Sequence, residues 1–119
     1  MARLVAAATV VVVFLAGCAD NPGLIHGSGT KQGDETRTVE CQDGTGVIMT
    51  NIDGTGRVVV SILGPGGASL YENTFDGTGD EHETQTITGA PGAWTVHASF
   101  GGQTSAGSFV GEWDIDLTC

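Results

Sequence analysis

From Arg37 onward, apolar and polar residues alternate with a period of two, which is typical of β-strands. The alternation is clearest near the C-terminus, where Phe109, Trp113 and Ile115 share one face and acidic or other residues lie between them. The segment RVVVSIL at 57–63 is rich in β-branched residues, which favour strands. We therefore expect strands at 37–41, 47–52, 57–63, 70–75, 83–88, 94–100 and 109–119.

Turn-forming sequences separate these segments. Asp-Gly-Thr-Gly occurs at 43–46, 53–56 and 76–79, and Asp-Gly supplies the positive φ angles of tight hairpins. Pro-Gly-Gly at 65–67 and Pro-Gly at 91–92 indicate two more connections. No segment after residue 18 shows helical periodicity with caps. The pattern predicts an all-β fold, a small antiparallel β-sandwich of about seven strands.

The first residues follow a different pattern. One basic residue, Arg3, precedes an apolar run from Leu4 to Ala16. This run fits a signal peptide and is shorter than the ~20 residues that a membrane-spanning helix requires. It ends in Leu15-Ala16-Gly17-Cys18, which resembles the lipobox of bacterial lipoprotein precursors: a Leu, two small residues and a Cys.

The lipobox resemblance implies a location outside the cytoplasm, in a bacterial cell envelope. Residues 1–17 would be removed as a signal peptide, and Cys18 would carry acyl chains such as palmitate that anchor the protein to a membrane. Two chains make such an anchor stable. Residues 19–36 contain Gly, Ser, Asn and Pro and only one apolar pair, Leu24-Ile25. We therefore expect residues 18–36 to form a lipidated flexible tether, and residues 37–119 to form the folded domain.

The charge of the mature chain limits its partners. After residues 1–17 are removed, three basic residues remain against fourteen acidic ones, a net charge of −11. An acidic surface repels phosphate backbones, so we expect no nucleic-acid partner. Attachment to the membrane would depend on the anchor at Cys18. Cations and basic proteins are electrostatically suitable partners, and an envelope protein or a glycan is a further alternative.

Two cysteines remain once Cys18 carries lipid. Cys41 and Cys119 lie on the inward faces of the first and last expected strands, and paired thiols are normal outside the cytoplasm. We expect a structural disulfide between them. The alternatives are a metal site or a reactive thiol, but neither has its usual Cys-x-x-Cys or nearby His context.

Candidate metal ligands gather in one acidic segment. Asp76, Asp80, Glu81 and Glu83 bring four carboxylates into eight residues of an expected turn, and Ca²⁺ prefers several oxygen ligands on an irregular loop. The spacing is not that of an EF-hand, so a solvated acidic turn is the main expectation and a calcium site the alternative. We expect no other cofactor.

Other chemistry has less support in the sequence. There is no Gly-x-Ser-x-Gly elbow, and we interpret His26, His82 and His97 as surface side chains, so a small hydrolase is the third hypothesis. Trp94 and Trp113 lie on apolar strand faces and are expected in the core. Tyr71 is then the one aromatic side chain that we expect to be available for stacking against a sugar.

The segment 58–94 loosely resembles accessory β-sandwich domains of bacterial secreted proteins. In both, a strand ends in Gly-Pro, here Gly64-Pro65, and a later strand opens with Pro-Gly-x-Trp, here at 91–94. The resemblance implies a fold and no ligand. We therefore expect a lipid-anchored, non-catalytic β-sandwich of the cell envelope that serves as a binding, adaptor or structural module. The alternative is a calcium- or carbohydrate-dependent recognition domain.

Overall fold

The computed structural model describes residues 21–102 and 107–119. The expected signal peptide and Cys18 lie outside these residues. The described part is built of strands and one short 3-10 helix, in the order β2 (Leu24–Lys31), β3 (Gly33–Cys41), β4 (Thr45–Leu63), η3 (Pro65–Gly67), β5 (Ser69–Thr88), β6 (Gly92–Gly101) and β7 (Phe109–Thr118). The expectation of an all-β antiparallel fold is confirmed. Within the described ranges, no helix has the length and apolar character needed to cross a membrane.

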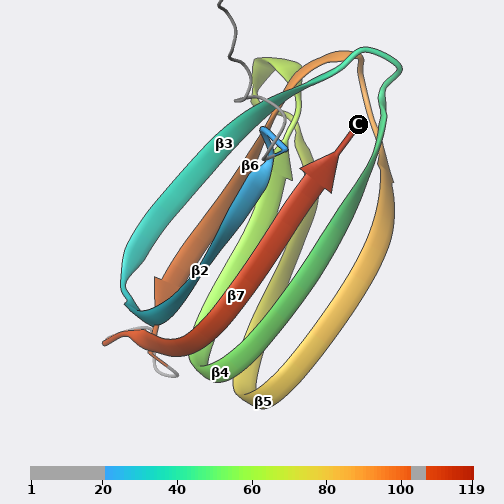
Figure 1. The fold of residues 1–119 in the computed structure, drawn as a ribbon. Coiled ribbons are helices and arrows are strands. Elements are labelled where there is room, and N and C mark those ends of the chain that lie inside the picture. Colours follow the sequence, from blue (N-terminus) through green and yellow to red (C-terminus); the bar gives the residue numbers. More distant parts are fainter. Residues whose placement is uncertain (1–20, 103–106) are drawn as a thin grey trace, which may run out of the picture.

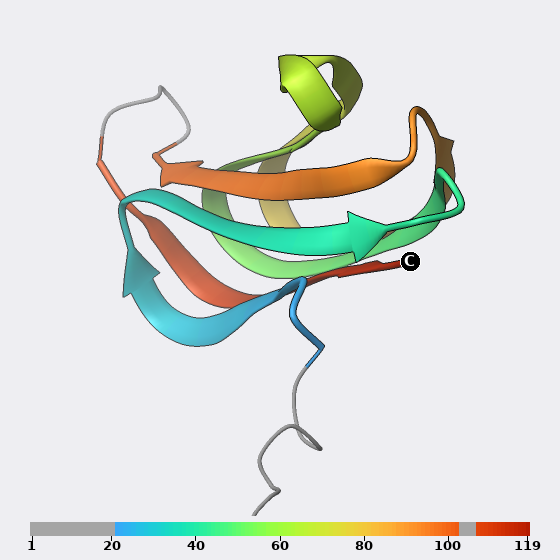
Figure 2. The same ribbon diagram turned by 90° about the horizontal axis from the view of Figure 1, so that it is seen from above.

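The strands form one sheet that folds over on itself (Figure 1). β5 pairs with β4 along nearly its whole length. The other edge of β4 pairs first with β7, over Val47–Thr55, and then with β6, over Arg57–Leu63. β2 extends the sheet beyond β7, and β3 extends it beyond β6. The sheet thus has two halves, which we call the β2–β7 layer and the β3–β6 layer; β4 and β5 run through both (Figure 2).

A row of four glycines marks the place where the sheet bends. Gly29, Gly111, Gly54 and Gly79 lie in register on four neighbouring strands. A Cβ atom on Gly54 would lie 2.3 Å from the carbonyl oxygen of Val110, and one on Gly111 would lie 2.2 Å from that of Asp53. Gly29, Gly79 and Gly111 also have positive φ angles, which other residues rarely adopt. We call this row the glycine crease.

The glycine crease corrects two of the three expected Asp-Gly-Thr-Gly turns. The copy at 43–46 lies at the connection between β3 and β4, with Gly44 at a φ of 69°. The copies at 53–56 and 76–79 lie inside β4 and β5 and pair with each other. Four expected strands are therefore two long ones. The turn prediction was wrong at these two places. Gly54 and Gly56 of β4 pair with Gly79 and Gly77 of β5, so both strands can bend together and neither reverses its direction.

The ordered domain also begins earlier than the sequence pattern indicated. Residues 24–36, which we expected in a flexible tether, form β2 and the beginning of β3. Ile25 is fully buried. Gly27 lies against the indole of Trp113, where a Cβ atom would come within 2.7 Å of the ring. The small residues of this segment thus permit close packing and strand pairing, and the tether prediction was wrong for them.

The core lies between the two layers. Phe100, Phe109 and Trp113 form an aromatic cluster with ring centroids 5.1–6.2 Å apart. Trp94 is fully buried, and its indole N–H donates to the carbonyl oxygen of Ala90 at 2.9 Å. The expectation that both tryptophans belong to the core is confirmed.

A disulfide joins the layers at the end opposite the glycine crease. Cys41 ends β3 and Cys119 follows β7, and their Cα atoms are 5.1 Å apart. The pairing expected from the sequence is present. Because Cys41 belongs to one layer and Cys119 follows a strand of the other, the bond holds the folded sheet closed.

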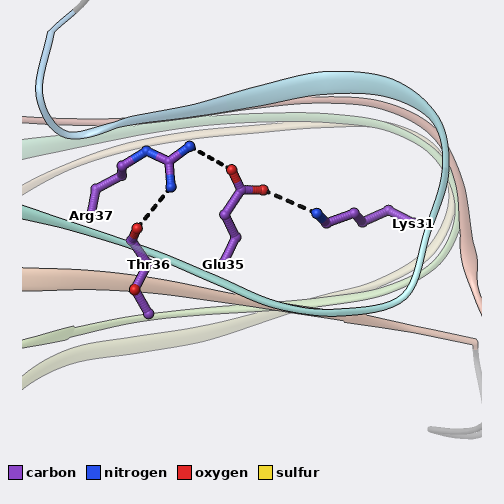
Figure 3. Close-up of polar contacts among 4 residues, drawn as sticks. All are labelled: Lys31, Glu35, Thr36 and Arg37. Atoms are coloured by element: carbon purple, nitrogen blue, oxygen red, sulfur yellow. Dashed lines mark hydrogen bonds and ion pairs between the residues drawn. The ribbon is translucent and has the colours of Figure 1, made fainter.

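Polar side chains bridge the layers along one open side of the sandwich, between β2 and β3. Glu35 lies between two basic side chains, Lys31 at 3.3 Å and Arg37 at 2.6 Å (Figure 3). The Lys31 ammonium also lies 5.8 Å from the ring centroid of Phe100. Partial burial opposes the charge of Glu35, but the hydrogen bonds from Arg37 and Lys31 outweigh it and lower the pKa of Glu35. This ion-pair cluster covers the aromatic core.

A hydrogen-bonded cluster occupies the opposite side, where β5 passes from one layer to the other. The Tyr71 hydroxyl donates to the Glu83 carboxylate, which also accepts from Asn73 Nδ2 at 3.1 Å. Burial, followed by the hydrogen bond to Glu83 and its negative charge, raises the pKa of Tyr71. Tyr71 and Asn73 come from one half of β5 and Glu83 from the other, so this cluster also connects the layers.

Candidate functional site

The structure does not bring the four candidate calcium ligands together. Because Asp76–Glu83 is a continuous strand, successive side chains point to opposite faces of the sheet. Asp76 forms an ion pair with Arg57 at 3.0 Å, and Asp80 lies 2.9 Å from His82 Nε2. Glu81 and Glu83 point to the inside of the sandwich, and the Glu83 carboxylate accepts the hydrogen bond from the Tyr71 hydroxyl there. Among the described residues, no three His, Cys, Asp or Glu side chains are arranged to hold a metal ion.

The sugar-binding and hydrolase hypotheses also lose their candidate residues. Tyr71 is partly buried and packs against the core, and its hydroxyl is bound to Glu83, so it is not the freely exposed ring that the sequence led us to expect. His97 Nε2 lies 3.4 Å from Asp34, and Ser99 hydrogen-bonds the same carboxylate. The Ser99 bond, followed by the contact with His97, lowers the pKa of Asp34. A serine nucleophile needs its hydroxyl against the imidazole, whereas this serine contacts the carboxylate.

A pocket of about 620 Å³ lies instead on the outer face of the β2–β7 layer. One row of its lining crosses four strands in register: His26 of β2, Asp114 of β7, Asn51 of β4 and His82 of β5. All four side chains are exposed. His82 Nδ1 contacts Asn51 Oδ1. We call this surface the outer-face pocket.

A second row lies one step nearer the glycine crease. It consists of Ser28, Glu112, Asp53 and Asp80, on the same four strands and again in register. The two rows exist because residues two apart on a strand share a face and because the four strands align these pairs. The outer-face pocket therefore contains four carboxylates, two imidazoles, an amide and a hydroxyl.

Among the described residues, Asp80 is the one carboxylate of the outer-face pocket with a basic side chain beside it, His82 Nε2 at 2.9 Å. The three described Lys and Arg side chains form ion pairs elsewhere, Lys31 and Arg37 with Glu35 and Arg57 with Asp76. Within the described ranges, Asp53, Glu112 and Asp114 make no contact with a basic side chain. Carboxylates on neighbouring strands repel one another, and a positively charged ligand would relieve that repulsion. Ammonium and guanidinium groups are the donors that carboxylates bind most strongly.

Comparison with known proteins gives no relative from which a function could be inferred. No protein-family model, curated protein or solved structure matches the chain. The function therefore has to be inferred from the chemistry of the outer-face pocket itself.

Sequence reasoning missed this site for two identifiable reasons. His26 and Ser28 were assigned to a tether, although both belong to β2. Asp53 and Asp80 were assigned to turns, although they are partners in the β4–β5 ladder. One signal was available: Glu112 and Asp114 alternate with core residues on the clearest strand of the sequence, which placed acidic side chains on one outer face.

Proposed function

We propose that this protein is a lipid-anchored, non-catalytic module of a bacterial cell envelope that binds a cationic ligand in the outer-face pocket. The observation that carries the proposal is the cross-strand arrangement of four carboxylates in a pocket without a neutralising Lys or Arg among the described residues. The sandwich provides a rigid scaffold for such a surface, because its layers are joined by a crease, a disulfide and two polar clusters.

The proposed anchor would hold the domain close to the membrane. Asn21 Nδ2 donates to the Leu117 carbonyl oxygen at 3.2 Å and to Thr118 Oγ1 at 2.8 Å, so the chain is fixed to the end of β7. Two residues, Ala19 and Asp20, lie between Cys18 and Asn21, so the two ends of this segment are at most about 11 Å apart. In this arrangement the disulfide end of the sandwich faces the lipid, the glycine crease points away from it, and the outer-face pocket opens sideways.

Calorimetric titration with spermine, a flexible organic cation, tests the binding proposal. We expect binding at low ionic strength that weakens steeply with added salt, and a large loss in an Asp53→Asn/Asp114→Asn variant. A charge-matched control, Glu40→Gln/Glu72→Gln, removes two exposed carboxylates outside the outer-face pocket. Equal binding by both variants would mean that net charge alone attracts the cation.

Cell fractionation tests the anchor separately. We expect Cys18→Ala to move the protein to the soluble fraction or to leave the precursor uncleaved. Normal cleavage with unchanged membrane retention would contradict the assignment of Cys18 as the lipidated residue.

A further inference from the structure

The two cysteines of the disulfide differ in their access to solvent. Cys41 is fully buried, and its Sγ lies 3.9 Å from the carbonyl oxygen of Val39. Cys119 is exposed and lines a cavity of about 210 Å³ at the end of the sandwich opposite the glycine crease. One side of the bond therefore faces the core, and the other faces solvent.

This difference decides which sulfur a thiolate can attack. In thiol–disulfide exchange the thiolate approaches one sulfur from the side opposite the leaving sulfur, and the rate depends on access to the attacked atom. Cys41 has no solvent-accessible surface from which such an approach could begin. An attack on Cys119 Sγ comes from the exposed side of the bond. The geometry therefore favours Cys119 as the attacked residue and Cys41 as the leaving group.

The cavity also favours one class of thiol over another. Beside Cys119 it is lined by two carboxylates, Glu40 and Asp43, and by the neutral side chains of Gln42 and Thr45, with no basic side chain among the described residues. An attacking thiolate is itself negative, so the carboxylates oppose its approach, and a second negative charge on the reagent adds to the repulsion. A positive charge on the reagent offsets it.

We propose that Cys119 is a thiol-modification site, at which a small uncharged or cationic thiol opens the disulfide. The thiolate sulfur bonds to Cys119 Sγ, the bond between the two cysteines breaks with its electron pair on Cys41, and Cys41 takes up a proton from water. The products are a mixed disulfide at Cys119 and a free thiol at Cys41, with no net oxidation or reduction. Attack by Cys41 on the mixed disulfide restores the original bond and releases the small thiol. The disulfide between the two layers thus depends on the thiols that surround the protein.

Mass spectrometry of the protein purified in detergent tests the site. Trypsin leaves Cys41 in peptide 38–57 and Cys119 in peptide 58–119. After brief exposure to cysteamine, a cationic thiol, and quenching with N-ethylmaleimide in guanidinium, we expect cysteamine on Cys119 and maleimide on Cys41 at least tenfold more often than the reverse. The same chain treated with cysteamine in guanidinium is the matched control and should give both products in comparable amounts. Comparable amounts from the folded protein, or reaction of the unfolded chain alone, would overturn the inference.

A second thiol tests the charge selection. Mercaptoethanesulfonate is similar in size to cysteamine but anionic. Relative to the rates on the unfolded chain, cysteamine should open the bond about tenfold faster at low ionic strength, and salt should reduce the difference. Asp43→Asn should also reduce it, whereas Glu72→Gln, which removes an exposed carboxylate outside the cavity, should not. Equal relative rates of the two thiols on the wild-type protein would overturn the selection by charge. Circular dichroism of each variant establishes that it is folded.

Discussion

Removal of the disulfide is expected to destabilise the domain more than any other change outside the core. Cys41 and Cys119 are separated by 78 residues. In the chain-entropy model, closing a loop of that length lowers the entropy of the unfolded chain enough to stabilise the fold by about 4.5 kcal/mol at 25 °C. The disulfide joins the two layers at the open end of the sandwich, opposite the glycine crease. A domain of this size unfolds with a melting temperature that shifts by about 4–8 °C per kcal/mol.

Thermal unfolding of a soluble domain that starts after Cys18, followed by circular dichroism, measures this effect. The oxidised protein should contain no free thiol, and a Cys41→Ala/Cys119→Ala variant should melt roughly 18–36 °C lower. Adding a reductant should lower the melting temperature of the wild-type protein and leave that of the variant unchanged. A shift below about 5 °C, or two titratable thiols in the oxidised protein, would refute the reasoning that the bond restrains the open end.

Other expectations follow from the crease, the bridging clusters and the separated carboxylates. Gly54→Ala should cost roughly 3 kcal/mol of unfolding free energy, because its Cβ would meet backbone, whereas Gly77→Ala, which meets only a flexible side chain at 3.4 Å, should be nearly neutral in the same urea titration. The pKa of Glu35 is lowered from its ordinary 4.5, so the charged Glu35 stabilises the fold above pH 4.5 and this contribution is lost as pH falls further. The difference in unfolding free energy between the wild-type protein and Glu35→Gln should therefore shrink below pH 4.5. A constant difference from pH 7 to 3 would contradict this prediction. Ultraviolet titration of Tyr71, the one tyrosine of the chain, should give ionisation above its ordinary pKa of 10.0, with stability declining as pH rises beyond that value. Ionisation at 10 would contradict both the partial burial of Tyr71 and its bond to Glu83. Calcium at 1 mM should shift the melting temperature by less than about 1 °C, whereas a site with a dissociation constant near 10 µM would add about 2.7 kcal/mol.

The strand content of the domain could be predicted because it depends on local alternation. Trp113 and Ile115 alternate with Glu112 and Asp114, and the structure places the first pair in the core and the second on the surface. The disulfide could be predicted because the folded part of the chain contains two cysteines, Cys41 and Cys119, and paired thiols are normal outside the cytoplasm; that Cys41 ends the second strand and not the first did not affect this reasoning.

The bend of the sheet could not be predicted, because it depends on register between distant strands. The sequence around Gly54 favours a turn. The sheet bends at this residue because Gly111 and Gly79 lie beside it on the neighbouring strands, and that pairing is not visible in the sequence. The pocket depends on the same register. His26, Asp53 and Asp80 come from segments that looked like a tether and two turns, so no local pattern could place them on one face.

The most direct test of the account is a chemical-shift titration of the ¹⁵N-labelled domain with spermine at low ionic strength. We predict perturbations concentrated at Asn51, Asp53, Glu112 and Asp114, while amides on the outer face of the β3–β6 layer remain unchanged. Shifts spread over both layers, or centred away from the outer-face pocket, would contradict the claim that this surface is the binding site.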